Sequence, residues 1–312
     1  MFDNLVEKLK ANPKRIVYTE GTDARILESA ARLKKDGFLT PVLLGNVEDV
    51  KAAAAKGGFD IEGLEIIDPE NYDGMDAMVE QMVELRRGKM TADECRAALK
   101  KSNYFGTMLV KMGLVDSLLG GATYSTADTV RPALQLVKTK PGRHQVSSSV
   151  ILTRGDELYV VLSASQQLAE TALECANTAK VFGLEPRVAM LSYSTHGSGH
   201  GPNVDLVRNA TAIAKAEAPD LALDGEMQFD AAVSETVGQL KFPGSPVAGH
   251  ANTFVFPDLQ SGNIGAKIAQ RFGGFELFGP LLQGLNAPIN DLSRGCNAEE
   301  VYITSILTAA MA

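Results

Sequence analysis

The alternation of short apolar runs with longer amphipathic segments limits the possible folds of this chain more than any other feature. Runs at 15–18, 41–45 and 64–67 have the length and composition of buried strands, and amphipathic segments follow them, the last at 75–87. Parallel strands need a crossover connection, usually a helix. This order therefore predicts an α/β fold with parallel-type sheets flanked by helices.

Local signals place the ends of several helices. The helix after the first strand is predicted to begin near Thr22 or Asp23 and to end at Gly37, and a last helix is predicted from about 297 to 310. Residues 1–10 predict an amphipathic helix with acidic residues, and they lack the apolar core of a signal peptide.

Two changes in composition suggest domain boundaries. A basic segment with Pro and Gly at 138–143 precedes a second strand–helix series, and a loop at 284–288 precedes the last helix. The second series has expected strands at 150–152, 159–162 and 188–191 and an expected helix at 166–182. We expect two α/β domains, one formed by 1–141 plus 285–312 and an inserted one formed by 142–284.

Charge and cysteine content exclude several functional classes. With 30 Lys and Arg against 38 Asp and Glu, the formal net charge is −8, and no basic run provides a nucleic-acid surface. The three cysteines are widely separated, lack metal-ligand spacing and favour a reducing compartment. No uncharged apolar stretch approaches the roughly 20 residues of a membrane helix. We expect a soluble cytoplasmic protein with no metal site that binds neither nucleic acid nor membrane.

Three strand-to-helix loops are candidate ligand sites, because open α/β sheets bind ligands beyond the carboxyl ends of their strands. The loop at 191–201 is rich in hydroxyl groups and glycine, and Ser194 and Thr195 in it are candidate phosphate ligands. The alternative is a surface loop with capping residues. Glycine residues between His196 and His200 argue against a helix and hence against a metal pair.

The second loop, at 256–267, opens a helix and contributes Asn263 and Lys267 as candidate substrate ligands. It matches neither the Walker A phosphate loop nor the dinucleotide fingerprint. On the pattern alone, a glycine-rich helix start with a surface lysine is the simpler interpretation.

The third loop, at 288–302, combines the most chemistry. It places the Ser293 hydroxyl, the Arg294 guanidinium and the carboxylates of Glu299 and Glu300 close together at a helix start. A guanidinium can hold a phosphoryl group through two hydrogen bonds. For Glu299 an interaction with the helix dipole is favoured, whereas Ser293, Arg294 and Glu300 together indicate an anion site with a possible proton acceptor.

Two further arginines are candidate anion ligands. Arg131 lies in a largely uncharged stretch at 125–134, where burial would demand an anionic ligand or an acidic partner. Arg86 lies in the expected helix 75–87, where a solvent-exposed position is the alternative.

Several motifs are spread along nearly the whole chain. They are ADTVRPALQ at 127–135, DGEMQFDAA at 224–232, GSPVAG at 244–249, GNIG at 262–265, GPLLQGLN at 279–286 and NDLSRGC at 290–296. Together they resemble the motifs of the phosphate acetyltransferase (phosphotransacetylase) family. The related phosphate butyryltransferases resemble the chain less.

The resemblance implies a fold, an assembly and a reaction. The fold is the two-domain architecture of isocitrate and isopropylmalate dehydrogenases, with an active-site cleft between the domains, and the assembly is a homodimer. The reaction moves an acetyl group between coenzyme A and inorganic phosphate, with acetyl-CoA, phosphate and acetyl phosphate as substrates and no redox cofactor. A carboxylate takes the proton from the coenzyme A thiol, and the thiolate attacks acetyl phosphate within a ternary complex.

The resemblance also implies roles for individual residues. Arg294, Arg131 and Arg86 match the family's substrate-binding arginines. Ser293 matches a hydroxyl that contacts the thiol or the developing oxyanion, and Glu300 stands where the family has its aspartate base.

Some positions depart from the family pattern. Glu300 is one methylene longer than aspartate, and misplacing a base by about an ångström can cost on the order of 10²-fold in rate. The segment after Val160 is several residues short, so an aspartate and a cysteine of the family have no counterpart. His196 and Ala266 replace a usual lysine and a usual tyrosine, and Cys296 occupies a cysteine position that the family does not need as a nucleophile.

These departures keep a second hypothesis open, a non-catalytic or weakly active homologue that binds coenzyme A. A third hypothesis, an NAD-dependent decarboxylating dehydrogenase of the same architecture, needs metal-binding aspartates and a nicotinamide loop, and the sequence shows neither. The intact Ser293–Arg294 pair together with Arg131 favours the active acetyltransferase.

Overall fold

The chain forms two compact units. The computed structural model describes residues 2–142, 146–163 and 168–312. We name the units the terminal unit (Phe2–His144 with Gly279–Ala312) and the central unit (Gln145–Phe278). The sequence analysis places the divisions after residues 141 and 284, and the units divide after residues 144 and 278. The shortened segment after Val160 falls in part on 164–167, which lie outside the described residues.

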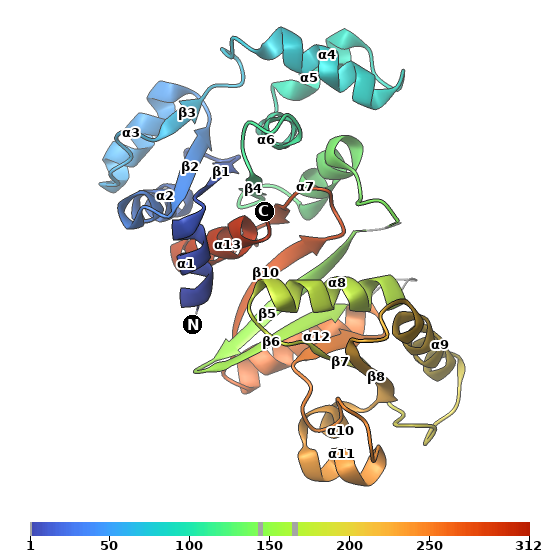
Figure 1. The fold of residues 1–312 in the computed structure, drawn as a ribbon. Coiled ribbons are helices and arrows are strands. Elements are labelled where there is room, and N and C mark those ends of the chain that lie inside the picture. Colours follow the sequence, from blue (N-terminus) through green and yellow to red (C-terminus); the bar gives the residue numbers. More distant parts are fainter. Residues whose placement is uncertain (1, 143–145, 164–167) are drawn as a thin grey trace. The chain divides into compact units, whose positions relative to one another are not determined.

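The terminal unit contains a parallel sheet of five strands among its described residues, in the order β11–β4–β1–β2–β3 (Figure 1). The strands are β1 (Lys14–Tyr18), β2 (Leu39–Leu44), β3 (Glu65–Ile67), β4 (Ser117–Gly120) and β11 (Ile289–Asp291). The helices are α1 (Asp3–Ala11), α2 (Ala24–Asp36), α3 (Val47–Gly57), α4 (Met75–Arg86), α5 (Ala92–Leu99), α6 (Ser102–Lys111), α7 (Thr126–Pro132), the π-helix η1 (Ala133–Val137) and α13 (Ala298–Ala310). The predicted strands and helices of this part of the chain are confirmed.

The boundaries of α2 follow from local chemistry. The Asp23 side chain caps the helix by accepting a hydrogen bond from the Arg25 backbone N–H, and Gly37 ends it in the left-handed conformation with φ of 75°. Asp is a preferred N-cap residue, and glycine adopts positive φ without a Cβ clash. Both ends of this helix are therefore readable from the sequence.

Helices cover both faces of the terminal sheet. The Tyr18 hydroxyl donates to Ser305 Oγ of α13 at 2.7 Å. The next residue, Thr19, lies against Gly106 of α6, where an added Cβ would come within 3.3 Å of Thr19 Cγ2. Successive side chains of an extended segment point to opposite faces. Helix α13 therefore packs on one face and α6 on the other, and Gly106 permits the close approach of α6.

The central unit contains a sheet of six strands among its described residues, in the order β10–β5–β6–β9–β7–β8. The strands are β5 (Ser147–Arg154), β6 (Glu157–Ser163), β7 (Arg187–Leu191), β8 (Ala222–Met227), β9 (Thr253–Phe256) and β10 (Glu276–Gln283), which contains the division between the units. The helices are α8 (Leu168–Val181), α9 (Pro202–Glu217), α10 (Phe229–Val233), α11 (Glu235–Lys241) and α12 (Leu259–Phe272).

The central sheet departs from a purely parallel arrangement. Strands β5 and β6 pair antiparallel, with Arg154 opposite Glu157, whereas β6, β9, β7 and β8 are parallel to one another. Only Gly155 and Asp156 separate the paired ends, and this connection is too short for a crossover to a parallel strand. The two-residue spacing therefore explains the hairpin, which the strand–helix rhythm alone does not predict.

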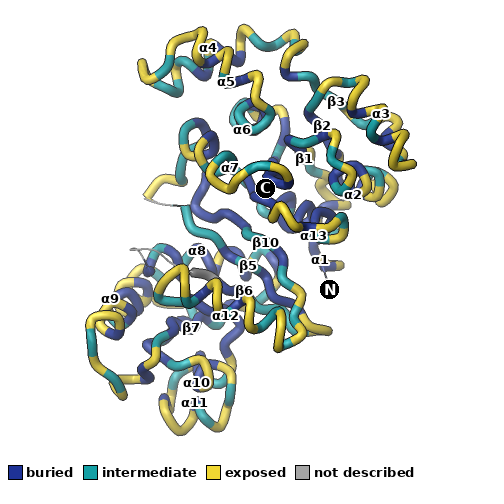
Figure 2. The backbone as a smooth tube through the Cα atoms, turned by 180° about the vertical axis from the view of Figure 1, so that it is seen from behind, coloured by how far each residue is buried: buried dark blue, intermediate teal, exposed yellow. Residues whose placement is uncertain are grey.

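Two apolar layers enclose the central sheet. One layer contains Leu152, Val161, Ala189 and Leu191 together with Ala266 of α12. Their neighbours along the strands, including Ile151, Val160, Val188 and Met190, are also buried and point to the opposite face by the alternation of a strand. Figure 2 shows the same distribution along the backbone, with the strands largely buried and the helices exposed along one side. No helix of the described residues is long and apolar enough to cross a bilayer.

Candidate functional site

The carboxyl ends of the terminal sheet's strands meet at one edge, because all of its strands are parallel. The loops that leave this edge lead into α2, α3, α4, α7 and α13. A polar cavity of about 700 Å³ opens among four of these loops, those after β1, β2, β3 and β4. Its lining residues include Thr19, Glu20, Asp23, Asn46, Asp68, Asn71, Lys100, Ser102 and Thr123.

The loop between β11 and α13 presents the predicted Ser293 and Arg294. Both residues are exposed, and the loop is tightened by a bond from the Cys296 N–H to the Ser293 carbonyl (2.9 Å) and one from the Gly295 N–H to Ser293 Oγ (3.3 Å). The Arg294 guanidinium has no hydrogen-bond or ion-pair partner within the described part of the chain. An unpaired cation at the carboxyl edge of a parallel sheet is suited to bind an anion.

Glu300 lies at the start of α13 and completes a capping box. Its backbone N–H donates to Asn297 Oδ1 (2.8 Å), and its Oε2 accepts from the Asn297 N–H (3.1 Å). The N-cap is therefore Asn297, and Glu300 is held in the first turn of the helix. The capping bond uses one carboxylate oxygen. Ser293 and Arg294 thus lie on the loop, and Glu300 lies in the first turn of the helix that follows it.

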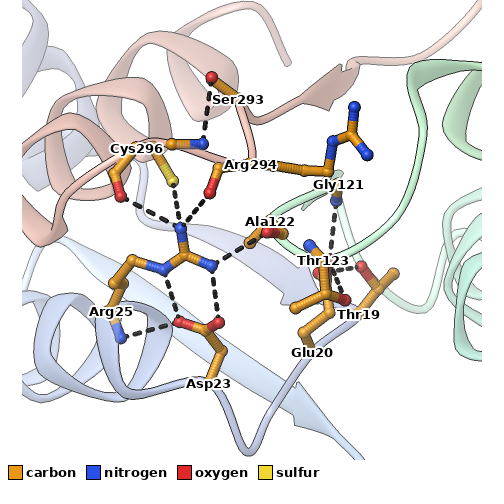
Figure 3. Close-up of polar contacts among 11 residues, drawn as sticks. Thr19, Glu20, Asp23, Arg25, Gly121, Ala122, Thr123, Ser293, Arg294 and Cys296 are labelled. Carbon is orange, nitrogen blue, oxygen red and sulfur yellow. Dashed lines mark hydrogen bonds and ion pairs between the residues drawn. The ribbon is translucent and has the colours of Figure 1, made fainter.

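Arg25 fixes the backbone of this loop, as Figure 3 shows. Its Nη1 donates to the carbonyl of Arg294 (2.8 Å) and to that of Cys296 (3.1 Å). Its Nη2 donates to the carbonyl of Ala122 (3.0 Å), in the loop after β4. Asp23 holds the guanidinium through two bonds, from Nε (2.9 Å) and from Nη2 (2.7 Å). These bonds lower the pKa of the Asp23 carboxyl.

Glu20 links two of these loops, the one after β1 and the one after β4 (Figure 3). Its Oε1 accepts from the backbone N–H groups of Gly121 and Thr123, each at 3.1 Å, and its Oε2 accepts from the Thr19 hydroxyl at 2.6 Å. Burial raises the pKa of Glu20, although these donors oppose the rise. Arg25 therefore links the loops after β1, β4 and β11, and Glu20 adds a second link between the loops after β1 and β4.

The loop after β4 approaches β11 closely at Gly121. Its φ is 94°, and a Cβ added there would lie 2.2 Å from Asp291 Oδ1. Asp291 is buried at the end of β11 and accepts hydrogen bonds from the hydroxyls of Thr126 and Thr129 in α7. These bonds attach α7, which carries Arg131, to the strand that leads into the Ser293–Arg294 loop.

Arg131 and Arg86 have different surroundings. Arg131 is exposed at the end of α7, so the burial that would demand a partner does not occur. Its charge adds to the Ser125 hydroxyl in lowering the pKa of Asp128. Arg86 is half-buried at the end of α4, and its Nε is buried without a hydrogen-bond partner in the described chain. Both guanidinium groups can therefore receive an anion.

Cys296 lies beside the loop as a buried free thiol. Arg25 Nη1 is 3.6 Å from its Sγ. Burial raises the pKa of this thiol, and the Glu300 charge adds to the rise while the Arg25 charge opposes it. A thiol with a raised pKa is a weak nucleophile at neutral pH.

In the central unit, the loop after β7 uses its hydroxyls internally. Ser194 and Thr195 are buried. The Ser194 hydroxyl donates to Glu226 Oε1 (2.9 Å) and accepts from the Gly199 N–H (2.9 Å), and Thr195 Oγ1 accepts from the Gln228 N–H (2.9 Å). These two hydroxyls therefore stabilise the loop, whereas a phosphate cradle requires exposed donors.

The helix α12 presents its predicted ligands to solvent. Asn263 and Lys267 are both exposed, and Lys267 Nζ lies 3.3 Å from Gln270 Oε1 on the same helix. Asp258 caps this helix by accepting from the Ser261 N–H at 2.8 Å.

The sequence analysis did not identify Glu20 and Arg25. Both residues follow the carboxyl end of β1. The segment 19–25 is therefore also a strand-to-helix connection, and its position at the end of a strand is the signal that could have identified it. The sequence predicts Asp23 as a helix cap. It does not predict the pairing of Asp23 with Arg25, or the bonds from Arg25 to carbonyls of distant loops. Among the described residues, no group of three or more His, Cys, Asp or Glu side chains is arranged for a metal ion.

Comparisons with known proteins show which family this chain is similar to. The family described as Phosphate acetyl/butaryl transferase matches residues 1–309. The phosphate acetyltransferase of Bacillus subtilis (strain 168) is 51% identical over 319 aligned positions, which cover 100% of this chain and 99% of the relative. That of Staphylococcus epidermidis (strain ATCC 12228) is 47% identical over 320 positions, covering 99% and 97%.

Solved structures give the same result for the fold. A phosphotransacetylase from Streptococcus pyogenes superimposes with a TM-score of 0.94 at 52% identity, covering 99% of this chain and 97% of the other. A branched-chain phosphotransacylase from Enterococcus faecalis V583 has a TM-score of 0.70 at 18% identity, covering 96% and 98%, and this likeness concerns the fold alone.

Proposed function

The chain belongs to the phosphate acetyl/butaryl transferase family, and from this premise we propose that it moves an acetyl group reversibly between coenzyme A and inorganic phosphate. It is an acyltransferase of acetate metabolism, and the reaction converts acetyl-CoA and phosphate into coenzyme A and acetyl phosphate, and the reverse. The hypothesis of a non-catalytic homologue is not favoured, because the relatives that match the whole chain are named phosphate acetyltransferases.

One observation in the site carries this proposal. The exposed Ser293 and Arg294 lie on a loop at the carboxyl edge of a parallel sheet, and Glu300 stands in the first turn of the helix that follows. An unpaired guanidinium can bind a phosphate or phosphoryl group through two hydrogen bonds. A hydroxyl and a carboxylate beside it are the groups that acyl transfer to a thiol requires.

In the proposed mechanism, Glu300 is the general base. Its Oε2 is held by the capping bond from Asn297, and for Oε1 the described residues provide no partner. A coenzyme A thiol transfers its proton to this carboxylate, and the sulfur attacks the carbonyl carbon of acetyl phosphate. The new carbon–sulfur bond forms a thioester, the carbon–oxygen bond to phosphate breaks, and phosphate leaves. A free thiol has a pKa of about 8.5, so the base must act within a site from which water is excluded.

Arg294 and Ser293 stabilise the negative charge that develops on the reacting groups. Arg294 neutralises the phosphate as it leaves, and the Ser293 hydroxyl donates to the thiolate or to the developing oxyanion. We assign Arg131, Arg86, Asn263 and Lys267 to substrate binding. Ser194 and Thr195 contribute to substrate binding only indirectly, because their buried hydroxyls stabilise the loop after β7.

The experiment follows consumption of the coenzyme A thiol with acetyl phosphate as the donor. We expect turnover by the wild-type chain and a loss on the order of 10²- to 10³-fold in kcat for Arg294→Ala. Arg15→Ala is the matched control, because Arg15 pairs with Glu65 at the opposite, amino end of the same sheet. Coenzyme A binding without turnover in the wild type would refute the proposal in favour of the non-catalytic homologue.

We also propose the conditions in which the enzyme works. It acts as a homodimer in the cytoplasm, and its three buried free cysteines suit a reducing compartment. It needs no cofactor besides its substrates, so dialysis against a chelator should leave kcat unchanged. Analytical ultracentrifugation tests the dimer, and a sedimentation coefficient of a monomer at micromolar concentration would contradict it.

A further inference from the structure

Arg25 makes its side-chain bonds to oxygen with Asp23 and with backbone carbonyls of the site loops. Its guanidinium makes five bonds to oxygen, two to Asp23 and three to backbone carbonyls. A guanidinium has five N–H donors in a fixed plane. Arg25 therefore has no donor left for a substrate.

The three carbonyls belong to loops that are distant in sequence. Arg294 and Cys296 lie in the loop after β11, and Ala122 lies in the loop after β4, while Arg25 and Asp23 lie after β1. All of these groups are within the terminal unit. A single planar group thus fixes the relative position of three loops at the carboxyl edge of the sheet.

Arg294 is held in the opposite way to Arg25. Its backbone carbonyl accepts from Arg25 at 2.8 Å, while its guanidinium extends from the loop and makes none of the contacts drawn in Figure 3. The backbone that directs this side chain is therefore fixed, and the charge at its end is free to bind an anion. Asp23 in turn fixes the plane of Arg25, because it binds both Nε and Nη2.

We propose that Arg25 is a positioning residue for acetyl transfer, acting through the backbone of 294–296 to aim the Arg294 guanidinium at the substrate. This inference rests on the proposed function for its kinetic consequence. A loss of the Arg25 side chain removes the donor to three carbonyls and the two side-chain donors to the Asp23 carboxylate. The loop then shifts, and a shift of about an ångström costs on the order of 10²-fold in rate.

A double-mutant cycle between Arg25 and Arg294 tests the kinetic part. We expect Arg25→Met to lower kcat/KM on the order of 10²-fold. If Arg25 acts through Arg294, the double variant with Arg294→Ala is no slower than Arg294→Ala alone by more than about threefold. Independent, multiplicative losses in the double variant would overturn the inference, as would wild-type activity in Arg25→Met.

Arg32→Met is the matched control for this cycle. Arg32 lies on the same helix and also contacts α13, but it pairs with the exposed Glu299 and stacks on the Tyr302 ring instead of holding the loop. We expect wild-type kcat/KM from this variant. If Arg25→Met fails to fold, Arg25→Lys replaces it in the cycle, because lysine keeps the charge and loses the planar fork.

Thiol labelling provides a readout that does not depend on catalysis. Cys296 is 6% exposed and its carbonyl is held by Arg25, whereas Cys95 and Cys175 are fully buried elsewhere. We expect iodoacetamide to label Cys296 at least tenfold faster in Arg25→Met than in the wild type, with Cys95 and Cys175 unchanged. An unchanged Cys296 rate would show that Arg25 does not hold the loop. Absence of acetyl transfer in the wild type would refute the proposed function and leave this labelling test intact.

Discussion

The substitution Glu226→Gln tests how the loop after β7 is held in the central unit. The Glu226 side chain is 2% exposed. Its Oε1 accepts from the Gly197 N–H (2.8 Å) and the Ser194 hydroxyl (2.9 Å), and both oxygens accept from Arg208 at 3.2 Å. Burial alone would raise the pKa of Glu226, but the bonds from Arg208, Gly197 and Ser194 outweigh it and lower the pKa to about 2.

The size and sign of the effect follow from proton linkage. The pKa falls from 4.5 in the unfolded chain to about 2 in the folded chain, which corresponds to about 3 kcal/mol of stability at pH 7. This contribution is complete above the unfolded pKa and is lost as the pH falls through the folded pKa. Linkage leaves about 2 kcal/mol of it at pH 3.5. Glutamine keeps the shape of the side chain and removes the charge, so Glu226→Gln should lose this amount.

Urea denaturation followed by far-ultraviolet circular dichroism at pH 7 and at pH 3.5 measures the difference. The chain contains no Trp, and its two units need not unfold in one step. Peptide-level hydrogen exchange at pH 7 therefore assigns the loss to the segment 192–201. Glu235→Gln, an exposed glutamate of the same unit, is the control and should leave the unfolding free energy unchanged. Equal stability of Glu226→Gln and wild type at pH 7, or a gap that does not narrow at pH 3.5, would refute the reasoning.

Three further predictions concern the carboxyl edge of the terminal sheet. Gly121→Ala should destabilise the chain by about 2 kcal/mol or more in thermal denaturation, because its Cβ would lie 2.2 Å from Asp291 Oδ1 at a φ of 94°; an unchanged melting temperature would contradict the close approach. Asn297→Ala should cost about 1 kcal/mol of unfolding free energy through loss of the helix cap, and full wild-type stability would show that the capping box is not needed. Glu300→Gln should lower kcat on the order of 10²- to 10⁴-fold in the thiol assay with little change in melting temperature, and a kcat near the wild-type value would exclude Glu300 as the base.

Much of the fold was predictable because its determinants are local. The β1 strand, the N-cap at Asp23 and the helix end at Gly37 each depend on residues within a few positions of themselves. The hairpin of β5 and β6 was also encoded locally, in the two residues between its strands, although the repeated strand–helix order directed attention to parallel pairing.

The candidate site divides along the same line. The shared location of Ser293, Arg294 and Glu300 was predictable because they are neighbours on one loop and helix start, and their types and spacing are the basis for the anion-site hypothesis. Ser194 and Thr195 were assigned from hydroxyl content, but their orientation depends on Glu226 and Gln228, which lie 32 and 33 positions away. Composition cannot tell whether a hydroxyl points to a ligand or to a buried partner.

By itself, the sequence determined the order of strands and helices, their ends and which side chains lie on the β11–α13 loop, since each of these depends on residues close along the chain. Only the tertiary structure decided what holds that loop. Arg25 lies 269 positions from Arg294 and 97 from Ala122, and Glu20 lies 103 from Thr123. These partners meet because a parallel sheet brings the carboxyl ends of all its strands to one edge, and hydrogen-bond donors find their acceptors there irrespective of separation in sequence.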